Sequence, residues 1–534
     1  MSDSSDDESV EFDESFWDDE MFSNDRSRLK NSSVDEALAR LISLRDEIDW
    51  TFEVQRLRLH EVLNFLVSRG WRGENLREIF TTGQIELLIW DSAMDKLDNN
   101  FAPQTAFYQN ACSIDFFVDT ARYRREPELD EAGRPSSRGV TLLHQMARLP
   151  ATSRTHRKFR IVALLFQLYD RYDVNCTDED GLTHFHVACM AGLDKTVRKF
   201  LRYGPDLDCV WRSTGDTPLH SALRHDHREV SVLLLRRGAD PNLANEKGET
   251  ALHIVCWKRH VDLAKVLFEV SVERNRPVRL DARDEEGRTA LEIAVASLSP
   301  DLVDLLLDRG ADLSSFVFPT VENFNEAFTR HSSLLLARAA GMMAVVECLE
   351  SRGHELDPSH AMVVVKFFVE HELFLRGSEL SCDGEEFARD AKRFTILPRI
   401  KYGVGSWKIE NNETRTTPRL SLGDLIRLRP EEAEQVVKCK DYLVLSNSDL
   451  LMILSRTPIV GRHWGACQRL LCEKLARKFF LSRALYPFWG LIRFRLPIEI
   501  CQWIIDELEN EDLCNILLAN ESMNNENKMS AIML

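Results

Sequence analysis

Four histidines stand at the same place in a recurring phrase, and they are the residues best able to do chemistry. The phrase has the form Gly-x-Thr-x-x-His, and its copies end at His144, His186, His220 and His253. Imidazole ligates metals and transfers protons near neutral pH, so metal binding and general-base catalysis are the chemical interpretations. Either role needs groups that converge on one point, whereas copies of a phrase place each histidine in its own unit. We therefore predict hydrogen-bonding scaffold roles for all four.

Other motifs for catalysis or metal binding are missing from the sequence. The twelve cysteines include no Cys-x-x-Cys pair, and their spacing predicts neither a zinc site nor a disulfide framework. Unpaired cysteines indicate a reducing compartment. There is no phosphate-binding loop and no nucleophile motif. The expectation is a protein that is not an enzyme and that needs no cofactor or metal.

Charge is distributed unevenly along the chain. The net charge is -18, and residues 1–25 hold eleven acidic groups and no Lys or Arg. This acidity disfavours nucleic-acid binding, which needs a basic surface. A basic run at 456–495 contains aromatic residues, but its apolar spacing favours a packed helix with a solvated basic face. The N-terminus does not resemble a signal peptide, and no run of 18 apolar residues predicts a membrane span. We expect a cytoplasmic protein, with the nucleus as a second location.

The elements that position the histidines form a tandem repeat. The glycines Gly181, Gly215, Gly248 and Gly287 open four clear copies, 34, 33 and 39 residues apart. A weaker copy begins at Gly139, and a degenerate one begins at His331. A repeat of this length is one supersecondary unit that buries its apolar face by stacking on its neighbours. The sequence predicts an elongated helical solenoid of about six units over residues 115–357.

Each residue type in the phrase has a structural reason. In the copy at Gly215, the glycine permits a positive φ at a turn, Thr217 suits an N-cap and Pro218 suits the first helical position. A small residue follows two places after each histidine position, which lets helices approach closely. A second helix then ends at Gly238, a predicted C-cap. The small residues are Ala188, Ala222, Val255 and Ala294.

These landmarks resemble ankyrin repeats. The resemblance implies that binding occurs at the hairpin tips and along the inner helices, where the copies differ. Trp and Arg are favoured interface residues. The predicted partner-binding residues are Trp211, Arg212, Arg224, His225, Trp257, Lys258 and Arg259. The alternative is that each is an ordinary exposed or packing residue.

A second motif lies near the C-terminus. The phrase Leu496-Pro-Ile-Glu-Ile predicts a helix opened by its proline, and Asp512-Leu513 begins another short helix. Together with the residues from about 420 onward, it resembles the F-box-like PRANC domain that follows ankyrin repeats in poxviral host-range proteins and some insect proteins. The resemblance implies docking to the Skp subunit of a cullin-RING (SCF) ubiquitin ligase. The residues that carry it are Leu496, Pro497, Ile500, Ile504, Leu508 and Leu513. The alternative is a helix pair that only caps the core of its own domain.

The expected fold is mainly all-α, with an ankyrin-repeat solenoid between other helical regions. The predicted parts are a disordered acidic tail (1–32), a helical N-terminal region (33–114), the repeats (115–357), a connector (358–419), the PRANC/F-box-like domain (420–520) and a C-terminal tail (521–534).

Two functions follow from this layout. The first is a protein adaptor that captures a target on its ankyrin face and brings it to the SCF ligase. The second is an IκB-like inhibitor or scaffold that sequesters a signalling or transcription factor. In both cases the chain is expected to be monomeric apart from its partners.

Overall fold

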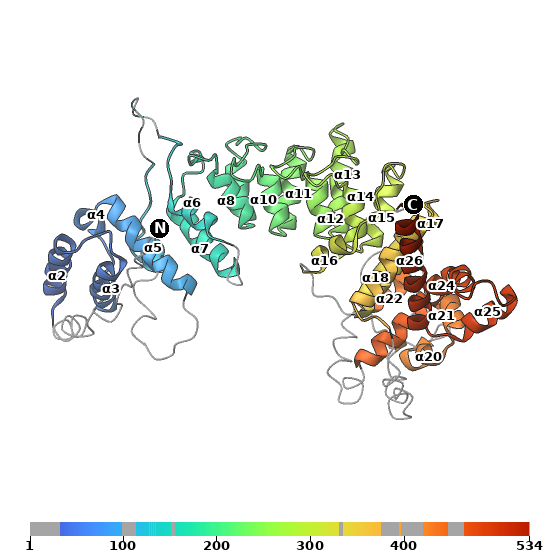
Figure 1. Ribbon diagram of the computed structural model, residues 1–534. Helices are drawn as coiled ribbons and strands as arrows, with labels where there is room; N and C mark the ends of the chain where they lie inside the picture. The colour runs from blue at the N-terminus through green and yellow to red at the C-terminus, as the bar shows by residue number, and fades with distance from the viewer. Residues whose placement is uncertain are drawn as a thin grey trace, which may run out of the picture. The chain divides into compact units, whose positions relative to one another are not determined.

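The structure is a computed structural model, and in the part of the chain that it describes the regular elements are helices apart from one two-residue strand pair (Figure 1). It describes residues 32–98, 114–127, 129, 131, 133, 135–150, 155–329, 335–374, 395–396, 420–446 and 464–532. The predicted acidic tail, apart from residue 32, lies outside this set, as does most of the predicted connector. The chain divides into a first unit, Met1–Glu246, and a second unit, Lys247–Leu534. The predicted all-α class is confirmed.

The first unit begins with a helical region, as the apolar spacing predicts. Ser33 and Glu36 form a capping box that starts the first helix. Arg56 and Asp91 then join two of the helices through a buried, two-pronged ion pair with N–O distances of 2.6 and 2.7 Å. The elements are α2 (Val34–Glu47), α3 (Glu53–Ser68), α4 (Leu76–Ile79), α5 (Thr82–Asp98) and a π-helical turn, η2 (Phe116–Thr120).

Three helix pairs follow in the first unit. They are α6 (Leu142–Arg148) with α7 (Thr155–Leu168), α8 (His184–Met190) with α9 (Asp194–Phe200), and α10 (Pro218–Arg224) with α11 (Arg228–Arg237). Thr217 caps α10, Pro218 opens it, and Gly238 ends α11 in the left-handed conformation. Ala188 and Ala222 are fully buried. The roles predicted for these residues from the phrase are confirmed.

A Gly215→Ala substitution tests the turn that opens the third pair. Gly215 has a φ of 70°, and a Cβ there would lie 2.2 Å from the backbone nitrogen of Glu246. Backbone cannot move aside cheaply, so we expect destabilisation of about 3 kcal/mol, measured as faster hydrogen exchange in α10. Gly204→Ala is the matched control, because Gly204 also has a positive φ but has open space around it. Equal effects of the two substitutions would contradict the close approach.

The second unit continues the repeats with two further pairs. They are α12 (Ala251–Trp257) with α13 (Val261–Glu273) and α14 (Ala290–Ala296) with α15 (Pro300–Asp308). The degenerate sixth copy does not form a helix pair. After α16 (Val321–Thr329), α17 (Leu335–Ser351) is a single helix that runs through Gly341. Gly341 stays helical because Leu298 packs against it, where a Cβ would meet the Leu298 Cβ at 2.9 Å.

The C-terminal helices are α18 (Pro358–Glu370), α20 (Leu422–Arg427), α21 (Pro430–Val436), α22 (Cys439–Ser446), α24 (Trp464–Leu491), α25 (Ile498–Glu507) and α26 (Asn510–Ile532). Of these helices, α22 and α24 pack on α17, and α20, α21, α25 and α26 pack on α24. A two-residue antiparallel pair joins β1 (Thr395–Ile396) to β2 (Leu420–Ser421). The sequence predicts a short last helix and a separate tail at 521–534, but α26 continues to Ile532. Its contacts with α24 and α18 extend it beyond the apolar motif.

Part of the basic run lies on α24, and several of its cations there have partners inside the second unit. Lys478 pairs with Glu434 at 2.7 Å, and Arg483 pairs with Glu350 at 2.7 Å. Buried Lys474 donates to the carbonyl of Leu428. Among these three cations, the predicted solvated basic face is wrong for buried Lys474, whereas the Lys478 side chain is 77% exposed. Their partners come from α17, α21 and the turn before it, which the local sequence could not reveal.

Candidate protein-binding surfaces

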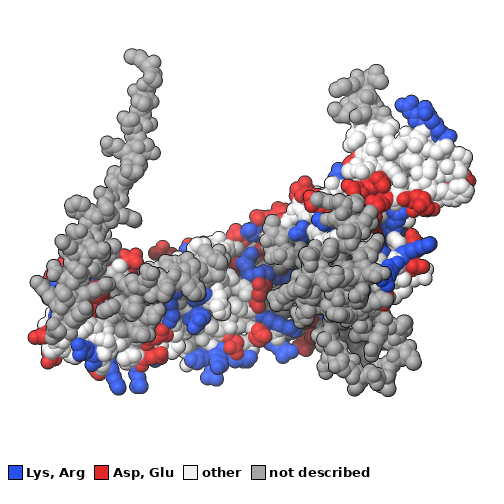
Figure 2. Space-filling model, turned by 90° about the horizontal axis from the view of Figure 1, so that it is seen from below, with Lys and Arg blue, Asp and Glu red and all other residues white. Residues whose placement is uncertain are grey.

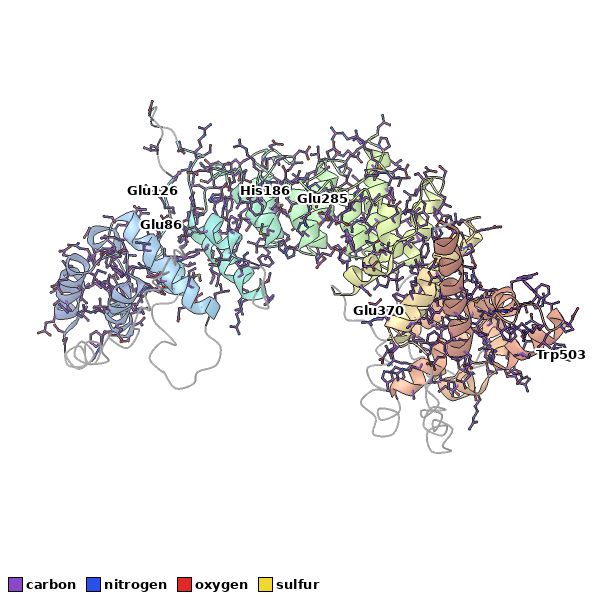
Figure 3. All side chains as sticks on the ribbon, in the orientation of Figure 1. Glu86, Glu126, His186, Glu285, Glu370 and Trp503 are labelled. Carbon is purple, nitrogen blue, oxygen red and sulfur yellow. The ribbon has the colours of Figure 1, made fainter. Side chains whose placement is uncertain are left out.

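The recurring histidines are buried parts of the scaffold. Thr183 donates its backbone N–H to His186 Nδ1 at 3.3 Å, and His186 Nε2 donates to the Cys209 carbonyl at 3.1 Å. His253 repeats this arrangement, with its Nε2 3.0 Å from the Ala282 carbonyl. Burial lowers the pKa of His186 to about 4, so its ring is neutral near pH 7. The predicted scaffold role is confirmed (His186 is labelled in Figure 3).

Trp211 and Arg212 lie on a hairpin in the first unit. The Trp211 backbone N–H donates to the Asp216 carbonyl at 3.0 Å and closes the hairpin. The Trp211 side chain is half-buried, while Arg212 is exposed. The backbone N–H of Arg212 donates to the Asp180 carbonyl of the preceding hairpin at 2.8 Å. This hydrogen bond joins the two neighbouring hairpins, so their tips form a rigid surface.

Arg224 and His225 lie beside that hairpin at the end of α10. Arg224 holds the buried carboxylate of Asp216 at 3.1 Å. His225 is the C-cap of α10, and its ring stands edge-on to Phe159 with 5.2 Å between ring centroids. Through Asp216, the fold brings the hairpin of Trp211 next to Arg224. Four of the sequence-predicted residues therefore occupy one repeat.

The other three predicted residues lie in the second unit and are less accessible. Trp257 is only 3% exposed, because the guanidinium of Arg288 covers its ring at 5.0 Å. Arg259 donates to the Leu298 carbonyl at 3.3 Å, and burial lowers its pKa. Lys258 is half-exposed. Trp257 thus packs within the repeats, whereas Lys258 and Arg259 are both partly exposed.

The F-box-like residues divide between two faces. Leu513 is fully buried and belongs to the core, and Ile504 and Leu508 are half-buried. Leu496 and Pro497 are exposed at the start of α25, where Pro497 is the N-cap rather than the first helical residue. Ile500 is half-buried. The buried face of α25 is formed by Cys501 and Ile505 instead.

Three large exposed residues near this helix were missing from the predicted docking set. Trp503 on α25 is 68% exposed (Figure 3), Tyr486 is 70% exposed and Phe494 is 64% exposed. Phe494 packs edge-on against Trp489, whose indole donates to the Leu496 carbonyl at 2.9 Å. Trp503 lies three residues after Ile500, so helical spacing places it on the same side of α25 as a predicted docking residue.

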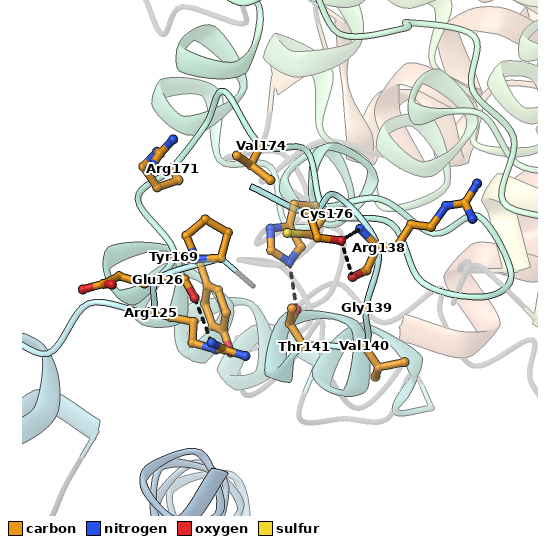
Figure 4. Close-up of a pocket in the computed structure, with 13 residues that line it drawn as sticks. Arg125, Glu126, Arg138, Gly139, Val140, Thr141, Tyr169, Arg171, Val174 and Cys176 are labelled. Atoms are coloured by element: carbon orange, nitrogen blue, oxygen red, sulfur yellow. Dashed lines mark hydrogen bonds between the residues drawn. The ribbon is translucent and has the colours of Figure 1, made fainter. Parts of the chain in front are cut away.

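The first unit also contains a pocket, and its lining residues do not suggest a catalytic or metal-binding site. It lies beside Thr141, whose hydroxyl is 2.8 Å from His184 Nε2 (Figure 4). Arg138 and Arg171 stand at opposite sides of it, and Arg171 is paired with Asp173. Among the described residues, no cluster of three His, Cys, Asp or Glu side chains has metal-binding geometry.

The described surface carries both signs of charge. Figure 2 shows Lys and Arg side chains interspersed with Asp and Glu on the face in view. Such a mixture lacks the single basic field that nucleic-acid binding uses. No helix in the described part of the chain has the length and apolar character that crossing a bilayer requires.

Comparison with known proteins identifies the repeated part. The family described as "Ankyrin repeats (3 copies)" matches residues 143–245 and 230–316. B-cell lymphoma 3 protein of Homo sapiens is 34% identical over 142 residues, 26% of this chain and 31% of that protein. The putative ankyrin repeat protein FPV014 of fowlpox virus is 36% identical over 98 residues, 18% of this chain and 21% of that protein.

A third relative is named as an enzyme. E3 ubiquitin-protein ligase KEG of Arabidopsis thaliana is 31% identical over 150 residues, 26% of this chain and 9% of that protein. The matches span less than a third of each of these three relatives. Similar repeats thus occur in proteins of very different size. Residues 143–316 of this chain match ankyrin repeats, a type of repeat that implies protein–protein interaction.

Proposed function

We propose that this protein is an adaptor that captures a target on its ankyrin repeats and docks a ubiquitin ligase through α25. The observation that carries the proposal is the 68% exposure of Trp503 beside the F-box-like opening Leu496-Pro497. Patches of exposed apolar residues mark protein-interaction sites, and Trp503, Phe494 and Leu496 are exposed apolar residues close together in the sequence. An amphipathic helix with such a face is suited to docking against an apolar partner surface. The partner is the Skp subunit of the SCF ligase.

The target-binding surface of the first unit lies on the repeat that contains Trp211, Arg212, Arg224 and His225, and Lys258 is a separate candidate in the second unit. A rigid aromatic next to cations offers contact area at low entropic cost. Asp216 orients Arg224, so this cation is pre-positioned. The chain is expected to act in the cytoplasm or the nucleus and as a monomer apart from these partners.

Trp503→Ala tests the ligase side of the proposal. The indole is 68% exposed and lies outside the buried core, so its removal should leave the fold intact. We expect binding to the purified Skp subunit to weaken about 30-fold, the loss typical of a central aromatic anchor. The measurement is isothermal titration of the full chain. Val436→Ala on α21 is the matched control, because Val436 is also an exposed apolar residue of these C-terminal helices.

Two outcomes would remove the proposal. One is that the unaltered chain does not bind the Skp subunit. The other is that Trp503→Ala binds as tightly as Val436→Ala. Deleting residues 496–534 is a poorer test, because it also removes buried Leu513 and Cys514 and so disturbs the core of the domain.

A second candidate function is sequestration without ubiquitination, as by IκB-like ankyrin inhibitors. The observation that favours it is that the family match and the similarity to B-cell lymphoma 3 protein concern the repeats alone. Under this function, Trp503→Ala should leave inhibition of the captured factor unchanged. Under the adaptor function, the same variant should allow the target to accumulate.

A further inference from the structure

A cavity of about 240 Å³ lies in the second unit, between the inner helices of the last repeats and the loop before α16. Its apolar lining includes Trp257, Ile293, Ala296 and Phe318. Val317 also lines it and is 64% exposed, so an apolar side chain stands in solvent at its mouth. The volume is below the range of about 300–1,000 Å³ that is usual for small-molecule sites. It suits one or two side chains of a partner better than a cofactor.

Two carboxylates, Glu286 and Glu292, line this cavity together with one cation, Arg288, and further carboxylates lie beside Arg288. Arg288 contacts Asp284 at 2.9 Å, Glu286 at 2.6 Å and Glu326 at 3.3 Å. Glu292 also lines the cavity, and its nearest cation is Arg283 at 3.9 Å. Four carboxylates thus meet two guanidinium groups. The Glu286 and Glu326 side chains remain 52% and 40% exposed, so their field reaches an incoming group.

The network also keeps the cavity in shape. Arg288 stacks on Trp257 at 5.0 Å while its nitrogens hold the carboxylates. The Glu292 carboxylate accepts the Val317 backbone N–H at 3.1 Å and the Thr289 backbone N–H at 2.9 Å. The loop that carries Val317 is thereby tied to α14. A partner segment would therefore meet a preformed site, which lowers the entropic cost of binding.

We propose that this cavity binds a flexible segment of the target protein in which an aliphatic side chain lies between basic residues. The aliphatic side chain enters the pocket over Trp257 and Ile293, and the flanking cations meet Glu286 and Glu326. The carboxylates attract a basic segment and repel an acidic one, and the apolar lining favours an aliphatic side chain. The proposal rests on the proposed function, since it specifies the target held by the ankyrin repeats.

The test uses the full chain with ¹³C-labelled Ile and Val methyl groups, since Ile293 and Val317 both line the cavity. The probes are the peptides acetyl-Gly-Arg-Leu-Arg-Gly-amide and acetyl-Gly-Glu-Leu-Glu-Gly-amide. We expect the arginine peptide alone to shift these two methyl resonances, with binding that weakens as salt is added. Glu286→Gln should weaken the arginine peptide about fivefold, the upper range for an exposed ion pair. Val317→Arg should weaken it further by adding like charge at the mouth.

Glu355→Gln is the matched control, because Glu355 is an exposed carboxylate elsewhere in the second unit. Equal shifts with the glutamate peptide, or unchanged arginine-peptide affinity in both Glu286→Gln and Val317→Arg, would overturn the proposal. The Skp titration involves a different surface and is independent of this result. If the chain binds the Skp subunit but not the arginine peptide, the adaptor function stands and the proposed chemistry of the target segment is wrong.

Discussion

Acidification from pH 7 to pH 4 is expected to destabilise the early repeats by about 3 kcal/mol through His186 alone. Burial lowers the pKa of His186 from 6.5 to about 4, so the folded ring stays neutral while the unfolded ring takes up a proton. Each pKa unit corresponds to about 1.4 kcal/mol. Stability is therefore fully present above about pH 6.5 and falls as the pH drops toward 4. Burial also lowers the pKa values of His144 and His184, which adds to the loss, and the pKa of His253, which gives the second unit the same sensitivity.

The geometry explains why protonation is not tolerated. Nδ1 of His186 accepts a hydrogen bond from the backbone N–H of Thr183, so a proton on Nδ1 would face a donor. His144 and His184 also lie with their ring centroids 4.8 Å apart, and two charged rings there would repel each other. The capping of α6 and α8 would be lost together.

Hydrogen exchange at pH 7, 6, 5 and 4, corrected for intrinsic rates, measures this effect. Protection in α8 should fall by about two orders of magnitude across the range. The internal control is α14, where Glu292 replaces the histidine and caps Thr289. If α8 keeps its protection down to pH 4, the buried histidines do not limit stability.

Arg477→Met is expected to release α25 from the C-terminal helices at a cost of about 3 kcal/mol. Arg477 is buried on α24 and donates to the carbonyls of Leu508 and Asp506, the latter at 2.8 Å. These carbonyls end α25, where a cation also suits the helix dipole. Its removal leaves buried acceptors without a donor, and hydrogen bonds to a charged group contribute about 1.5–3 kcal/mol each.

The readout is hydrogen exchange of residues 498–507, which should lose about 100-fold in protection. Arg495→Met is the matched control, because Arg495 is exposed near the start of the same helix. The proposed docking to the Skp subunit should weaken in Arg477→Met although this side chain does not belong to the exposed face. Unchanged protection in α25 would show that its other contacts suffice to hold it.

Local signals in the sequence predicted the repeats well. Gly215, Thr217 and Pro218 act within a few residues of one another, and each has a conformational preference that is independent of the rest of the chain. The same holds for Gly238, whose left-handed φ ends α11. The prediction of a helix pair for the degenerate copy at His331 was wrong. Gly341 by itself indicates a turn, but Gly341 packs against Leu298 and stays within a helix.

The candidate surfaces were predicted less completely. Trp257 and Leu513 have the residue types of an interface, but one is covered by Arg288 and the other is fully buried. Residue type gives no information about which neighbour covers a side chain. Trp503 shows the converse, because its exposure depends on Cys501 and Ile505 forming the inner face of α25.

The sequence by itself determined the ankyrin repeats, their capping and the scaffold role of the histidines, because these depend on contacts within one repeat or with the next. Only the tertiary structure decided which side chains reach solvent. It paired the cations of α24 with distant acceptors and turned Trp503 outward. It also assembled the cavity over Trp257 from two repeats and the following loop. Exposure and charge clustering depend on residues far apart in the chain, so a local pattern does not encode them.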